Sequence, residues 1–77
     1  MFYVYAISSI NKNYIYVGLT GNLEKRFYQH NTGKEKTTKT YLPFKLLFTQ
    51  KFNTRKEARV AEKKYKSGYG KEFLRNL

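Results

Sequence analysis

The architecture is set by residues 2–20, which read FYVYAISSINKNYIYVGLT. Aromatic and β-branched residues alternate with other residues over Phe2–Ser8 and again over Tyr14–Thr20, a pattern typical of β-strands. The intervening segment, SINKN, is rich in residues that favour a turn. We therefore predict an antiparallel hairpin. The period-two alternation of strands then allows Tyr5 and Tyr16 to share one face of the sheet.

A short helix is predicted after the hairpin. Asn22 is a favoured helix N-cap and Gly33 a favoured stop, so we expect the helix over residues 23–31. At about 100° per residue, His30 falls on the apolar stripe of this helix and Arg26 lies beside that stripe. A cation and an imidazole are therefore expected along the buried edge of the helix.

The middle of the chain is predicted to contain a loop and a third strand. The segment Lys34–Tyr41, KEKTTKTY, is polar and basic, which indicates an exposed loop. After Pro43, the segment Phe44–Phe52, FKLLFTQKF, has the composition and partial alternation of a strand with a basic outer face.

A second helix is predicted from the capping-box pattern of Thr54 and Glu57, and it is expected to extend to Lys66. On this helix Glu62 lies about 40° from Ala58 and so falls on the inward stripe. A carboxylate on the apolar side of a helix is unusual and marks a candidate functional group.

The end of the chain, with the segment GYG at residues 68–70, is expected to reverse direction and to finish in a short helical turn over residues 71–77. The predicted fold class is therefore α/β (α+β), with a β-β-α-β-α core and a three-stranded antiparallel sheet flanked by helices. We expect a single domain over residues 1–77, because a chain of 77 residues has room for only one small core.

The charge of the chain favours a polyanionic partner. Sixteen Lys and Arg residues against five acidic residues give a formal net charge of +11. Nucleic acid is the leading candidate partner, and an anionic membrane surface is the main rival. The chain has no apolar run near the roughly 20 residues that span a bilayer and no secretory signal pattern. We therefore expect a soluble, cytoplasmic protein.

The inventory of reactive side chains excludes several kinds of site. There is no cysteine, which excludes disulfides, thiolate nucleophiles and cysteine-bound zinc. The only histidine is His30, so metal sites that need two histidines are excluded. All five carboxylates are Glu, which leaves few ligands for a metal cluster built from several carboxylates. Any phosphoryl chemistry must use one or two Glu, one His and the abundant tyrosines.

Several motifs occur in order along the chain: Tyr3-Val4-Tyr5, then Tyr16-Val17-Gly18, then an NLxxRxxxH stretch from Asn22 to His30, then the helical Glu62. Over about residues 2–67 this set resembles the GIY-YIG nuclease family, and most closely its small single-domain branch related to the catalytic module of bacterial nucleotide-excision-repair nucleases. The first motif is YVY in place of GIY and the second is YVG in place of YIG, so both changes keep the family's tyrosines. Many members also have an Asn a dozen or so residues after the Glu, a place that Asn76 occupies here.

The resemblance implies a role for each of five residues. Glu62 would hold one Mg²⁺ or Mn²⁺ ion, which accepts a single carboxylate together with waters and substrate phosphate. Tyr5 would act as the general base or position the attacking water, with Tyr16 orienting it. Arg26 would contact the scissile phosphate, and His30 would accept or relay the tyrosine proton. Nearby cations are expected to lower the pKa of Tyr5 towards neutrality.

Each of these residues also has a purely structural interpretation. The two tyrosines are of a kind common in half-buried sheets, and the histidine of a kind common at helix edges. Arg26 would then pair with a carboxylate on the surface, and Glu62 would pair with Lys66 four residues later. The order and spacing of all five residues favour a site.

The predicted function is a metal-dependent endonuclease with low intrinsic sequence specificity, acting as a monomer on nucleic acid, with DNA the expected substrate. The alternative is a non-catalytic, basic nucleic-acid-binding module of the same fold. Binding to a lipid surface is disfavoured, because neither helix has a broad apolar face free to enter a bilayer. The residues expected to contact nucleic-acid phosphates are Lys12, Lys25, Lys34, Lys36 and Lys39.

Overall fold

The sheet and its helices follow the predicted order along the chain. A computed structural model describes residues 1–77. Its elements are β1 (Phe2–Ser9), β2 (Ile15–Thr20), α1 (Leu23–Asn31), the 3₁₀ turn η1 (Lys39–Tyr41), β3 (Phe44–Phe52), α2 (Arg55–Lys66) and α3 (Gly68–Arg75). The predicted α+β class and the β-β-α-β-α core are confirmed, with η1 as an addition. The short helical turn expected over residues 71–77 is part of α3, which begins earlier, at Gly68.

The strands form one antiparallel sheet in the order β2-β1-β3. β1 is therefore the central strand, hydrogen-bonded on both edges. Tyr5 lies opposite Gly18, and Ile7 lies opposite Tyr16. Because directly opposed residues point to the same face, this register places the side chains of Tyr5 and Tyr16 on one face of the sheet.

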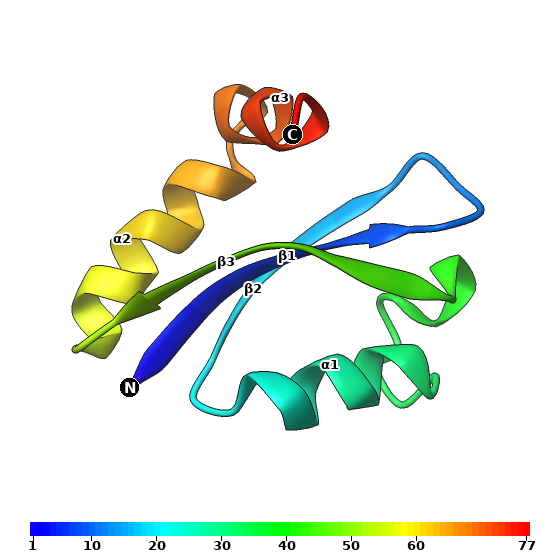
Figure 1. The fold of residues 1–77 in the computed structure, drawn as a ribbon, viewed down its shortest axis with the longest axis horizontal. Coiled ribbons are helices and arrows are strands. Elements are labelled where there is room, and N and C mark those ends of the chain that lie inside the picture. The colour runs from blue at the N-terminus through cyan, green and yellow to red at the C-terminus, as the bar shows by residue number, and fades with distance from the viewer.

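Each face of the sheet is covered by its own helical layer, as Figure 1 shows. On one face, α1 packs through Leu23 and Phe27 against Tyr5 and Ile7. On the other face, α2 and α3 cover a second apolar cluster, whose buried members are Val4, Ala6, Ile15, Val17, Ala58 and Leu74. Alternate residues of β1 thus enter two different cores, which explains why that strand is apolar on both faces.

The predicted helix boundaries are set by capping side chains. The Asn22 side chain accepts a hydrogen bond from the Lys25 amide at 3.1 Å and begins α1. The Thr54 hydroxyl accepts one from the Glu57 amide at 3.2 Å and begins α2. After α1 the chain turns at Gly33, whose φ of 77° is readily adopted only by glycine.

The segment Lys34–Tyr41 is not the wholly exposed loop that its composition suggests. Thr38 has no exposed surface. The ring of Tyr41 stacks on that of Tyr14, with 3.8 Å between ring centroids. In this polar segment Thr38 is thus buried and Tyr41 half-buried because each finds a specific partner, and composition alone carries no signal of such pairing.

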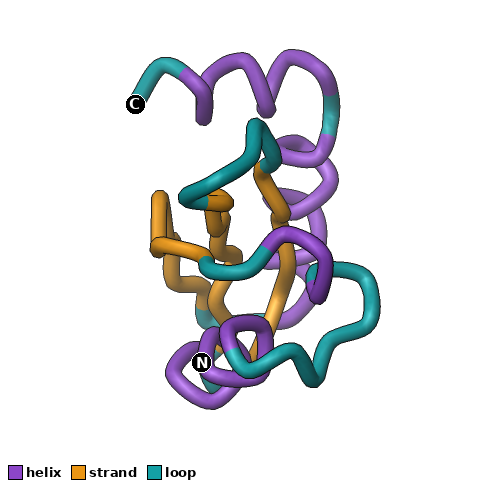
Figure 2. The backbone as a smooth tube through the Cα atoms, turned by 90° about the vertical axis from the view of Figure 1, so that its right-hand side faces the viewer, coloured by secondary structure: helices purple, strands orange, loops and turns teal.

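The expected chain reversal at residues 68–70 is also wrong, because these residues form the first turn of α3 (Figure 2). The turn between α2 and α3 lies at Ser67, whose hydroxyl donates to the Lys64 carbonyl at 2.6 Å and accepts from the Gly70 amide at 3.1 Å. A Cβ on Gly70 would collide with the backbone of Lys64 and Tyr65. The two helices therefore meet closely at this corner. None of the helices has the length and apolar character that a bilayer-spanning segment requires.

Candidate functional site

Three rings gather on the face of the sheet that α1 covers. β1 contributes Tyr5, β2 contributes Tyr16, and the last turn of α1 contributes His30. The centroid of the His30 ring lies 5.8 Å from that of Tyr5 and 4.8 Å from that of Tyr16. Gly18 makes room for this cluster, because a Cβ there would lie 2.5 Å from the Tyr5 hydroxyl and 3.0 Å from the Tyr16 ring.

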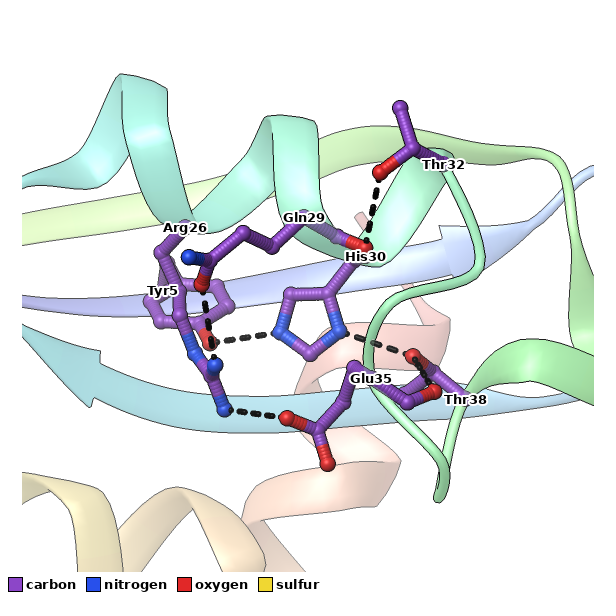
Figure 3. A network of polar contacts seen from close by, with 7 residues as sticks. All are labelled: Tyr5, Arg26, Gln29, His30, Thr32, Glu35 and Thr38. Atoms are coloured by element: carbon purple, nitrogen blue, oxygen red, sulfur yellow. Dashed lines mark hydrogen bonds and ion pairs between the residues drawn. The ribbon is translucent and has the colours of Figure 1, made fainter.

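His30 connects the strand tyrosine to the loop after α1, as Figure 3 shows. Its Nε2 lies 2.8 Å from the Tyr5 hydroxyl, and its Nδ1 lies 2.8 Å from the Thr38 hydroxyl. The Thr38 hydroxyl in turn donates to the backbone carbonyl of Glu35, over a longer 3.5 Å. Both hydroxyl protons have acceptors if His30 carries its proton on Nδ1 and leaves Nε2 bare. In that arrangement Tyr5 donates to Nε2, and Nδ1–H donates to Thr38.

Arg26 lies one helical turn before His30 and extends along the same network. Its Nη2 donates to the Glu35 carboxylate at 2.9 Å, and its Nη1 donates to the Gln29 side-chain oxygen at 3.2 Å. About a third of the Arg26 side chain remains exposed, at 31%. The guanidinium therefore lies at the solvent edge of the ring cluster, already paired with a carboxylate.

Burial dominates the ionisation of this network. It raises the pKa of Tyr5 to about 12, although the positive charge of Arg26 acts in the opposite direction. Burial, together with the charge of Arg26, lowers the pKa of His30. Tyr5 and His30 are therefore both neutral near pH 7. The expectation that nearby cations lower the pKa of Tyr5 is wrong for this chain on its own, because removing the hydroxyl from water outweighs one guanidinium at the rim.

Glu62 is not joined to this network. Its only ion pair is with Lys66, at 3.1 Å, which is the structural alternative considered for it. Glu62 belongs to α2, whose packing residue Ala58 enters the apolar cluster on the opposite face from Tyr5. The Glu62 side chain is largely covered, with 15% exposed, whereas that of Lys66 is 52% exposed. No group of three or more His, Cys, Asp or Glu side chains is placed to hold a metal ion.

The Tyr5–His30 pair at the centre of the ring cluster is closed to solvent. Tyr5 and His30 are almost completely buried, while Tyr16 and Arg26 are half-buried. The molecule has four surface hollows, and none is lined by any of the five predicted site residues. The largest, of about 310 Å³, lies beside the start of α1 and is lined in part by Tyr3 and Asn22. In this conformation the five predicted site residues therefore share no surface hollow.

The predicted phosphate-contacting lysines are all exposed: Lys12, Lys25, Lys34, Lys36 and Lys39. Lys12 also has a structural partner, since its ammonium donates to the Thr40 carbonyl at 3.2 Å and lies over the Tyr41 ring. Asn76, in contrast, ends α3, where its side chain donates to the Glu72 carbonyl at 2.9 Å.

Two members of the network were missed by reasoning from the sequence. Glu35 and Thr38 belong to the loop that was expected to contact solvent or nucleic-acid backbone. Glu35 is the only carboxylate in a segment of closely spaced lysines, but a carboxylate there also offsets the repulsion between those lysines, so the sequence did not indicate its pairing with Arg26. Thr38 carried no signal either, because a single threonine in a polar segment does not indicate burial.

Comparison with known proteins identifies the family. A family model described as the GIY-YIG catalytic domain matches residues 1–76. A UPF0213 protein of Bacillus licheniformis is 42% identical over 65 residues, which are 83% of this chain and 66% of that protein. One of Streptococcus agalactiae is 43% identical over 53 residues, which are 68% of this chain and 60% of the relative. The chain thus spans less than two thirds of the length of these two relatives.

A solved structure has the same fold. The solution NMR structure of a UPF0213 protein from Bacillus halodurans superposes with a TM-score of 0.59 at 33% sequence identity, covering 100% of this chain and 85% of that one. The resemblance seen in the ordered tyrosine, Arg-His and Glu motifs is therefore confirmed across nearly the whole chain. This protein belongs to the GIY-YIG catalytic domain family, a family of nucleases.

Proposed function

We propose that residues 1–77 act as a metal-dependent endonuclease that hydrolyses phosphodiester bonds in DNA with little sequence preference. The observation that carries the proposal is the hydrogen bond of 2.8 Å between the Tyr5 hydroxyl and Nε2 of a buried, neutral His30. A neutral imidazole that accepts a hydrogen bond from a phenol is placed to act as a general base towards it.

The proposed proton path runs through Tyr5. With a pKa of about 12, Tyr5 holds its own proton at neutral pH and is a poor base by itself. As Tyr5 gives this proton to Nε2 of His30, the phenol oxygen takes a proton from the attacking water. The water is left as hydroxide and His30 as imidazolium. Tyr16, whose ring centroid lies 6.3 Å from that of Tyr5 and which is only half-buried, would orient the water from the solvent side.

Arg26 is proposed to bind the scissile phosphate. Its planar guanidinium suits two parallel hydrogen bonds to phosphate oxygens, and its position at the exposed edge of the cluster leaves it within reach of a substrate. It would stabilise the charge that develops on the phosphoryl oxygens during cleavage.

The residues present are compatible with one hard divalent ion held by a single carboxylate, and not with a metal site whose ligands all come from the protein. Glu62 offers a single carboxylate, and the lysine paired with it is exposed and able to swing away. Mg²⁺ keeps most of its waters and accepts such a sparse site when substrate phosphate completes it. Glu62 would hold the ion, which would supply charge neutralisation when bound. Because α2 packs on the opposite face of the sheet from the ring cluster, the ion and Arg26 would act on one phosphate only if the substrate spans the edge of the sheet between them.

Cleavage assays test the proposal. Nicked, branched, single-stranded and duplex DNA would be incubated with Mg²⁺ or Mn²⁺ and, separately, with EDTA. We expect metal-dependent cleavage that falls about 10²- to 10⁴-fold in Tyr5→Phe and in Glu62→Gln. Tyr28→Phe and Glu72→Gln are the matched controls, because both residues are exposed and lie outside the network. Undiminished cleavage in Tyr5→Phe and Glu62→Gln would defeat the assignment.

A second candidate function is a non-catalytic nucleic-acid-binding module. The closed Tyr5–His30 pair and the pairing of Glu62 with Lys66 favour it. It predicts salt-dependent DNA binding with no product under any metal condition, whereas metal-dependent product that disappears in Tyr5→Phe would exclude it.

A further inference from the structure

The phosphate-binding group of the proposed site is already occupied by an anion from the same chain. The Glu35 carboxylate accepts a hydrogen bond from Nη2 of Arg26 at 2.9 Å. The side chains of both residues are partly exposed, at 24% for Glu35 and 31% for Arg26. Figure 3 shows the two side chains meeting beside the His30 ring. The ion pair thus lies at a partly exposed edge of the ring cluster.

The loop holds Glu35 in this position through its backbone. The Glu35 carbonyl accepts hydrogen bonds from the amides of Thr38 and Lys39 at 3.2 and 3.0 Å. Thr38 is buried and bonded to His30, which anchors the turn to α1. The positive φ of Gly33 lets the chain reverse directly after that helix. The fold therefore fixes the Glu35 backbone next to Arg26, while the carboxylate remains free to rotate outwards.

A carboxylate and a phosphate present the same chemistry to a guanidinium, namely anionic oxygens spaced for parallel hydrogen bonds. From this geometry we infer that Glu35 occupies the phosphate position of Arg26 and that a substrate phosphate binds by displacing it. This inference rests on the proposed function. Glu35 is thus a residue that sets the affinity of the site for phosphodiesters.

The competitor is present at every working pH. Burial alone would raise the pKa of Glu35, but the hydrogen bond from Arg26 and the charge of that residue hold the pKa below its usual value. Glu35 therefore stays ionised in neutral and mildly acidic solution. Only an anion that binds Arg26 about as strongly as this carboxylate displaces it. A partly exposed ion pair of this kind weakens a competing interaction by about two- to fivefold.

The test compares two variants that each remove one negative charge. Glu35→Gln frees Arg26, whereas Glu72→Gln removes a carboxylate from an exposed pair with Arg75, on α3. Binding of a short fluorescein-labelled DNA duplex would be measured by anisotropy in EDTA, so that no cleavage occurs. We expect Glu35→Gln to bind about two- to fivefold more tightly than Glu72→Gln. In an Arg26→Gln background, Glu35→Gln should give no advantage over Glu72→Gln.

Equal or weaker binding of Glu35→Gln relative to Glu72→Gln overturns the inference, because Glu35 would then be irrelevant or would support Arg26. Resolved NMR signals of the Arg26 side chain give a second readout. If the Arg26 signals of Glu35→Gln do not shift when the duplex is added, the inference is also overturned. This holds even where the affinities of the two variants are too weak to be compared. The proposed function fails separately, through absence of cleavage with metal in variants that still bind.

Discussion

His30 holds the candidate site together, because its two ring nitrogens bond side chains from different parts of the chain. Nε2 meets Tyr5 on the central strand, and Nδ1 meets Thr38 in the loop after α1. Its ring also lies within 6.3 Å, between centroids, of the rings of Tyr16 and Phe44. A charged imidazole at this position would lose an acceptor and would lack water, so the fold favours the neutral form.

The stability of the protein should therefore fall as His30 is forced to take up a proton. Its folded pKa lies below the unfolded value of about 6.5, so between these two values the unfolded chain binds more protons and acid favours unfolding. We expect the free energy of unfolding in urea to be flat above about pH 6.5 and to fall below it by up to about 1.4 kcal/mol per pH unit. His30→Gln should show no such slope between about pH 6.5 and 5.5. An identical slope in both proteins would contradict this expectation.

Gly18 is the residue that permits the two tyrosines to lie so close together. A Cβ at this position would lie 2.5 Å from the Tyr5 hydroxyl, and Tyr5 is buried and cannot move aside freely. We expect Gly18→Ala to destabilise the protein by about 1–3 kcal/mol and to reduce cleavage by displacing the phenol from His30.

Gly21→Ala is the control for that substitution. Its added methyl group would meet only the Met1 carbonyl, at 3.9 Å, so both stability and cleavage should stay close to those of the parent. Thermal unfolding and single-turnover cleavage of the two variants would be compared. Equal behaviour of Gly18→Ala and Gly21→Ala would show that the space beside Tyr5 is not restricted.

The helices α2 and α3 form a tight corner that depends on one glycine. Gly70→Ala would bring a methyl group against the backbone of Lys64 and Tyr65, and backbone cannot move away as a side-chain tip can. We expect it to destabilise the protein by at least about 1–3 kcal/mol. Gly68→Ala, two residues earlier in the same helix, meets no atom within 4 Å and should be neutral or stabilising by up to about 1 kcal/mol. Equal melting temperatures would contradict this account of the corner.

The elements with strong local signals could be predicted from the sequence, including the hairpin, α1 with its Asn22 cap, β3, and α2 with its Thr54 cap. The first turn of α3 could not, because two glycines normally indicate a turn. Here Ser67 caps that turn, and the second glycine is required by the closeness of the two helices. Tertiary packing overrode local preference.

The grouping of Tyr5, Tyr16, Arg26 and His30 could likewise be anticipated, since strand and helix periodicity place them on facing surfaces. The partners of these residues could not. The pairing of Arg26 with Glu35 depends on the path of a loop, and periodicity says nothing about loops. The elevated pKa of Tyr5 depends on how deeply the sheet is covered, which is a property of the assembled layers.

The charge of the whole molecule should govern its encounter with DNA. With a net charge of +11 and exposed lysines in the loop after α1, affinity should fall steeply as salt displaces the phosphate contacts. In a plot of log affinity against log salt concentration, we expect the slope to become less steep by about 0.9 in each of Lys36→Gln and Lys39→Gln, the value for one lost phosphate contact. Lys63→Gln on the exposed side of α2 is the control and should leave the slope unchanged. Equal slopes in all three variants would exclude the loop as the contact surface.

The placement of β1 between two helical layers has a further consequence for motion. Its amides are hydrogen-bonded to strands on both edges, and its side chains are buried in two separate cores. Hydrogen exchange there should require global unfolding, so the phenol of Tyr5 sits on the most slowly exchanging segment of the chain. The loop from Gly33 to Thr40 contains no strand and should exchange sooner. Under the proposed function, the phenol that takes the water proton would thus lie on a part of the molecule that stays in place while a substrate phosphate displaces the Glu35 carboxylate from Arg26.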